Sequence, residues 1–206
     1  MKSLLIKQAI VVPLAAMLIP ILVAFFLPGY SSISQHISEV ELLDNPIATI
    51  QRIAVVVTSV SIVLFGVGVF RVSCGRMGFT AVIAVIAGLS FASNAVFIMS
   101  SPLHGLNGLG GFSMVLVPAF FAAEIQQLGS SSRIRQLSLL VTAVFMAYLW
   151  LMLAGLDPSH FRGLTQRLIT VIYFGWFSLV CYWMSYRAAG VSVQRVTSFD
   201  ETAAAG

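Results

Sequence analysis

Histidine is the residue type in this chain with the widest chemical repertoire, and the chain has three, His36, His104 and His160. Together with Glu39 or Asp157 they could hold zinc, since a catalytic zinc site uses three protein ligands and a water molecule. Such a site would suit hydrolysis of a lipid. The histidines lack the HExxH type of spacing, and lone histidines lie more often in loops or at helix ends. The sequence therefore assigns no cofactor and keeps zinc as an alternative.

Further polar residues lie near the histidines, and with them form a candidate cluster for ligand binding or for joining helices. Its members are Ser38, Glu39, His104, Asn107, Asp157, His160, Arg162, Gln166 and Arg167. Arg162 and Arg167 could bind phosphate or carboxylate groups through paired hydrogen bonds, or could pair with Glu39 and Asp157 inside the protein. We favour internal pairing, because a buried arginine without a partner is costly. Ser38 and Glu39 could equally cap a short interfacial helix.

The segments between these polar residues are long apolar stretches. The chain has 206 residues, of which 59% are hydrophobic and 9% charged, and its mean hydropathy is +0.99. A soluble domain has about 25% charged residues, so a water-soluble fold and a disordered chain are both excluded. A transmembrane helix needs about 20 mostly apolar residues. Six stretches qualify: residues 4–27, 53–70, 79–99, 106–123, 137–156 and 168–186.

The predicted fold is all-α: a polytopic integral membrane protein with a six-helix transmembrane bundle. Residues 1–186 form its single domain, and residues 187–206 form a mobile tail without apolar periodicity. The six stretches contain one charged side chain, Lys7, as the cost of ionic groups in hydrocarbon requires. Pro13 and Pro20 predict a kink in the first helix, which is too long for the apolar core of a signal peptide.

The basic residues predict how the bundle is oriented. Eight lysines and arginines flank the stretches on the side of the two termini, and three flank them on the other side. Because cytoplasmic flanks hold the excess of basic residues, both termini are expected in the cytoplasm. The three histidines and the polar cluster then gather at the outer mouth of the bundle. We expect Glu39, His104 and Arg167 to converge there, since each would otherwise be isolated in an apolar rim.

Short motifs in the polar segments carry a family resemblance. They are Pro28-Gly29-Tyr30 with Ile37-Ser38-Glu39, His104-Gly105, and Gly163-x-x-Gln166-Arg167. At these places, and over residues 28–186, the chain resembles the six-span bacterial and archaeal membrane proteins catalogued as domain of unknown function 998. In that family the motifs belong to the first outer loop, the start of the fourth span and the entry to the sixth.

This resemblance implies the six-span architecture and singles out five residues without assigning a reaction. They are Ser38, Glu39, His104, Gln166 and Arg167. The chain departs from the pattern in two places. It has Val40-Glu41 where the family usually has Leu-Gly, and residues 99–102 lack an aspartate that the family often has before the histidine.

The favoured function is that of a non-catalytic, multi-pass membrane protein whose outer polar cluster binds a lipid headgroup or a small ligand. The first alternative is a membrane-embedded, metal-dependent lipid hydrolase. The second is a small transporter or channel, although only Asn94 and the prolines of the first helix point that way.

Membrane lipids are the expected partners, and the expected location is the cytoplasmic (inner) membrane of a bacterium. The basic residues follow from topology and anionic headgroups, so a nucleic-acid partner is not expected. A homo-oligomer is compatible with the sequence.

Overall fold

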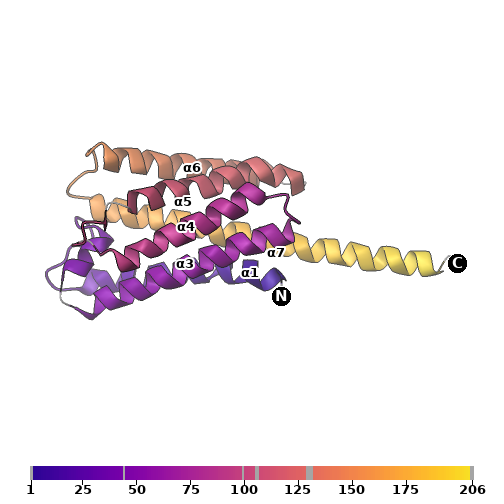
Figure 1. Cartoon of the computed structure of the whole chain (residues 1–206), viewed down its shortest axis with the longest axis horizontal. Coiled ribbons are helices and arrows are strands. Elements are labelled where there is room, and N and C mark those ends of the chain that lie inside the picture. Colours follow the sequence, from indigo (N-terminus) through magenta and orange to yellow (C-terminus); the bar gives the residue numbers. More distant parts are fainter. Residues whose placement is uncertain (1, 44, 99, 105–106, 129–131, 205–206) are drawn as a thin grey trace.

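A computed structural model describes residues 2–43, 45–98, 100–104, 107–128 and 132–204, which are helical apart from short connections (Figure 1). Short 3-10 helices, labelled η, interrupt or extend the α-helices. The elements are α1 (Lys2–Lys7), η1 (Gln8–Ile10), α2 (Val12–Val23), η2 (Ala24–Phe26), η3 (Ile37–Leu42), α3 (Pro46–Val72), α4 (Gly78–Val96), α5 (Asn107–Glu124), η5 (Ile125–Leu128), α6 (Ser132–Leu153) and α7 (Arg162–Ala204).

Six helical segments are long and apolar enough to cross a membrane, which confirms the predicted all-α architecture. They are Leu4–Phe26, Pro46–Val72, Gly78–Val96, Gly110–Leu128, Ser132–Leu153 and Arg162–Tyr186. Both termini lie at one end of the bundle (Figure 1). The connections from α2 to α3, from α4 to α5 and from α6 to α7 lie at the opposite end, which we call the loop end.

At the loop end, two helices begin earlier than hydropathy predicts. The second span starts at Pro46 rather than at residue 53, because Asn45 Oδ1 accepts a hydrogen bond from the Ile47 amide at 2.8 Å and caps the helix. The last span starts at Arg162 rather than at residue 168. Its first turns are polar, and they remain helical because their side chains bind other parts of the protein.

The first span is irregular near the prolines, as predicted. The 3-10 helix η1 precedes Pro13, which has no N–H to donate to the carbonyl four residues earlier. The side chain of Gln8 crosses to α3, where its Nε2 donates to the Ser61 carbonyl at 3.0 Å and its Oε1 accepts from the Ser61 hydroxyl. These bonds tie the broken first span to the second.

Helix α3 packs closely on α4, and α7 supplies the aromatic centre of the bundle. A Cβ added at Gly88 would lie 2.8 Å from the Ser59 carbonyl oxygen, so the two backbones approach closely at this glycine. Tyr173, Trp176 and Phe177 of α7 are all buried. The Phe177 ring packs edge-on against Phe65 of α3, with 4.9 Å between centroids.

A buried carboxylate caps α4 at the end of the bundle that holds the termini. Glu124 of α5 accepts hydrogen bonds from the amide of Phe79 at 3.1 Å and from the amide and hydroxyl of Thr80 at 2.8 and 2.7 Å. The first amides of a helix lack helical partners, and a negative charge there is favourable. Glu124 therefore has a structural role.

Helix α7 continues beyond the bundle to Ala204, so the backbone of residues 187–204, which lie in the predicted mobile tail, is helical (Figure 1). The expected mobility of this segment stays a prediction.

Candidate functional site

Residues 30–42, here called the docked loop, pack on the first turns of α7 at the loop end. Arg167 is 3% exposed and is the main anchor. Its Nη1 donates to the carbonyl oxygens of Ser32 at 2.7 Å, Gln35 at 3.1 Å and Gly163 at 2.8 Å. Its Nη2 donates to the Tyr30 hydroxyl at 2.7 Å. One guanidinium thus holds several groups of the docked loop against α7.

Aromatic rings complete the surroundings of Arg167. Its guanidinium carbon lies 5.8 Å from the centroid of the Phe25 ring and 5.6 Å from that of Tyr30. The Tyr30 hydroxyl donates to the His36 carbonyl at 2.8 Å. Burial raises the pKa of Tyr30 above its ordinary value, although the hydrogen bond from Arg167 opposes that shift. Tyr30 is therefore a neutral structural group at physiological pH.

The other residues of the Gly163-x-x-Gln166-Arg167 motif also hold the docked loop against α7. Gln166 Oε1 accepts from the Ile37 amide at 2.6 Å, and the Leu164 amide donates to the Ile33 carbonyl at 2.9 Å. A Cβ added at Gly163 would lie 2.1 Å from the Gln35 carbonyl oxygen. Only glycine allows the docked loop to approach α7 this closely.

The internal pairing expected for the two arginines is found with Glu39 for Arg162 rather than for Arg167. Glu39 pairs with Arg162, with 3.1 Å between Oε1 and Nη2, and Arg162 Nε also donates to the Ser34 carbonyl at 2.8 Å. Glu39 Oε1 further accepts from the His36 amide at 3.0 Å and so caps η3, as one of the sequence alternatives proposed. Arg162 and Arg167 are five residues apart on α7, which separates them by about 7.5 Å along the helix axis and places them on different faces. Arg167 therefore contacts backbone carbonyl groups instead of Glu39.

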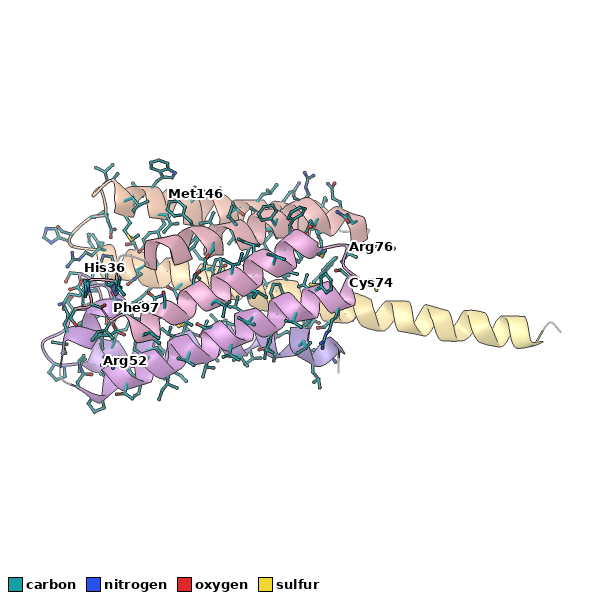
Figure 2. The ribbon with its side chains drawn as sticks, in the orientation of Figure 1. His36, Arg52, Cys74, Arg76, Phe97 and Met146 are labelled. Atoms are coloured by element: carbon teal, nitrogen blue, oxygen red, sulfur yellow. The ribbon has the colours of Figure 1, made fainter. Side chains whose placement is uncertain are left out.

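Asp157 pairs with a histidine rather than with an arginine. Its Oδ2 lies 3.6 Å from His36 Nε2, and its Oδ1 accepts from the Thr165 hydroxyl at 3.3 Å. The connection between α6 and α7 is thereby joined to the docked loop. Figure 2 labels His36 at the loop end and Cys74 and Arg76 at the opposite end.

A cavity of about 410 Å³ lies beneath the docked loop. The docked loop covers it with four residues, His36, Ile37, Ser38 and Glu41. Helices α2 to α7 form its walls, which are mostly apolar. Six polar wall residues interrupt that surface: Gln51, Asn94, Tyr148, Gln166, Thr170 and Tyr173.

The predicted site residues divide between the cavity and the docked loop. His104, Ser38 and Gln166 line the cavity, whereas Arg162 and Arg167 are engaged by the docked loop. Among the predicted residues, Glu39 pairs with Arg162, Arg167 donates to docked-loop carbonyl groups, and His104 lines the cavity; the convergence of Glu39, His104 and Arg167 stays a prediction.

His104 and His160 lie in different surroundings. His104 Nδ1 lies 2.8 Å from the Phe97 carbonyl oxygen, and His160 is exposed on the connection between α6 and α7. The side chain of Asn107 lies outside the part that the structure describes. Among the described residues, no three histidine, cysteine, aspartate or glutamate side chains gather closely enough to share a metal ion. His36, His104 and His160 therefore do not form the ligand set that zinc requires.

Sequence reasoning missed several polar cavity residues, among them Gln51 and Tyr148. Gln51 lies on α3 before the apolar stretch that begins at residue 53, so hydropathy assigned it to a connection. Tyr148 lies within the fifth apolar stretch and has no sequence feature that separates it from a lipid-facing tyrosine. The sequence feature that could have identified Gln51 as a site residue is its position, because it is a polar residue one to two turns inside a span.

A family model described as "Protein of unknown function (DUF998)" matches residues 10–183, which include most of the bundle and all of the docked loop. No curated protein and no solved structure matches the chain.

Proposed function

The chain belongs to the DUF998 family, whose function is unknown, and we propose that it binds a small amphiphilic molecule in the cavity beneath the docked loop. The cavity itself carries this proposal. Its volume of about 410 Å³ falls within the range of about 300–1,000 Å³ typical of ligand sites, and its surface combines apolar walls with a few polar groups.

The order of residues along the helices supports an amphiphile rather than a wholly apolar ligand. On α3 and α4 the polar lining residue lies nearer the loop end than its apolar neighbour in the cavity. The pairs are Gln51 and Val55 on α3 and Asn94 and Phe91 on α4, and on α7 the polar Gln166 is the lining residue nearest the loop end. A ligand with its polar group toward the docked loop and its apolar part deeper in the bundle would match both regions.

The proposed orientation places the loop end outside a bacterial cytoplasmic membrane. The excess of basic residues at the opposite end supports it, because cytoplasmic flanks hold such an excess. The ligand would then enter from the outer leaflet or the external aqueous phase.

The test compares a cavity-filling variant with an adjacent control. Val55 lines the cavity and is 3% exposed, whereas Val56 is 46% exposed on the outside of the same helix. The protein is purified in a mild detergent, and bound amphiphiles are extracted and identified by mass spectrometry. We expect Val55→Trp to lose the bound molecule and Val56→Trp to retain it, with gel filtration confirming that both are folded.

If the parent protein yields no bound amphiphile, and added amphiphiles do not raise its thermal midpoint, the proposal fails. It also fails if the two tryptophan variants bind equally.

A lipid hydrolase is the second candidate, and one observation favours it. The His36–Asp157 pair lies beside Ser38, which also lines the cavity, and a carboxylate that orients a histidine is a common arrangement for activating a hydroxyl. The reconstituted protein would be given fluorogenic acyl esters. Hydrolysis that is lost in both His36→Ala and Ser38→Ala would support an enzyme, and absence of hydrolysis by the parent protein would remove this candidate.

A further inference from the structure

Two buried polar atoms in the cavity wall have no hydrogen-bond partner among the described residues: Gln51 Oε1 and the Tyr148 hydroxyl oxygen. Gln51 is 5% exposed. Buried polar groups nearly always have partners, and an unpartnered one costs free energy. A ligand that bonds to both groups would remove that cost.

The two groups lie at the same depth. Gln51 is five residues after the start of α3 at Pro46, and Tyr148 is five residues before the end of α6 at Leu153. Each is therefore about 7.5 Å along its helix from the loop end. Helices α3 and α6 are separated by α4 and α5 (Figure 1), so Gln51 and Tyr148 would contact a ligand in the cavity from different walls.

The charge of the cavity does not suit an anionic headgroup. Among the described residues that line it, none is lysine or arginine, and Glu41 supplies a carboxylate. Arg162 and Arg167 are engaged by the docked loop, and Arg52 pairs with Glu41 at 3.9 Å. A phosphate would thus lose its hydration without gaining a cation.

Hydroxyl groups match the two side chains. One hydroxyl can donate to Gln51 Oε1 and another can accept from the Tyr148 hydroxyl, because each alcohol has one donor and two acceptor lone pairs. The cavity volume of about 410 Å³ lies in the lower part of the range of about 300–1,000 Å³ typical of ligand sites, which suits a single-chain molecule.

We infer that the ligand is an uncharged, single-chain lipid with free hydroxyl groups, which Gln51 and Tyr148 bind at the loop end of the cavity. This inference rests on the proposed function, because it names the class of molecule that the cavity takes.

The experiment measures equilibrium binding of four ten-carbon probes to the full chain in nanodiscs. The probes are decanoylglycerol, methyl decanoate, decanoate and decyltrimethylammonium. We expect decanoylglycerol to bind about a hundredfold more tightly than each of the others, which corresponds to two well-formed hydrogen bonds.

Variants then assign that preference to the two side chains. We expect Gln51→Leu and Tyr148→Phe each to weaken decanoylglycerol binding about tenfold and to leave methyl decanoate binding unchanged. Thr58→Val is the matched control, because Thr58 is fully buried on the same helix, has an unpartnered hydroxyl and does not line the cavity. It should leave binding of both probes unchanged.

The outcomes separate the two proposals. If the probes bind equally, if decanoate or decyltrimethylammonium binds best, or if the two variants lose no preference, the inference is overturned while the proposed function stands. If no probe binds and the parent protein carries no amphiphile, the proposed function fails and the inference with it.

Discussion

The hydroxyl of Tyr173 donates a hydrogen bond of 2.7 Å to the backbone carbonyl of Met114. That carbonyl lacks its helical donor, because Pro118 lies four residues later in α5 and has no N–H. Within a membrane a freed carbonyl must find a partner in the protein, and Tyr173 of α7 provides it. Both residues line the cavity, so this bond fixes α5 against α7 where the proposed ligand binds.

Tyr173→Phe should lower the free energy of unfolding by about 1–2 kcal/mol, since it leaves the Met114 carbonyl unpartnered. In a Pro118→Ala background the helix supplies its own donor, so the same substitution should cost clearly less. Reversible unfolding in mixed micelles measures both values. Equal costs in the two backgrounds would contradict this account of the bond.

Arg167→Met should destabilise the protein by about 3 kcal/mol, because the Tyr30 hydroxyl and several carbonyl groups lose a charged donor. Arg162→Met should cost about 1 kcal/mol or less, since the Arg162 side chain is 40% exposed and its pair with Glu39 is partly solvated. Unfolding measurements compare the two.

The same measurements test which arginine Glu39 depends on. Adding Glu39→Gln to Arg167→Met should recover none of the lost stability, because Glu39 pairs with Arg162. Recovery of most of the loss would restore the pairing of Arg167 with Glu39 that the sequence suggested.

Gly163→Ala should displace the docked loop, because its Cβ would lie 2.1 Å from the Gln35 carbonyl oxygen. We expect a loss of about 2 kcal/mol or more and faster proteolysis of residues 30–42. Gly175→Ala on the same helix is the control, since its Cβ would meet nothing within 4 Å. It should be neutral or stabilise the helix by up to about 1 kcal/mol. Equal effects at the two glycines would disprove the close approach.

Thiol labelling tests which side of the membrane each end faces. Cys74 is exposed at the end that holds the termini, and Ser31 is exposed on the docked loop. With Cys181→Ala as the background, Cys74 should not react with a membrane-impermeant reagent in intact cells. Ser31→Cys combined with Cys74→Ala should react. The reverse pattern would show that the loop end faces the cytoplasm.

Much of the fold could be predicted because hydropathy is a local property with a fixed length scale. About 20 apolar residues match the thickness of a bilayer, so the six spans follow from composition alone. The even number of spans also brings the two termini to one end of the bundle. The polar segments with His36 and His104 therefore lie together at the opposite end. Glu39 as a helix cap was equally available, because a cap depends on residues three positions apart.

Only the tertiary structure decided which polar groups meet. Arg162 and Arg167 are equal candidates for Glu39 in the sequence, and the rotation of α7 against the docked loop assigns the pair to Arg162. Gln51 and Tyr148 are nearly a hundred residues apart, and they face one cavity because of how α3 to α6 pack. Such contacts depend on the depth and rotation of whole helices. The packing of small and aromatic residues sets that depth and rotation, and no local window of sequence contains this information.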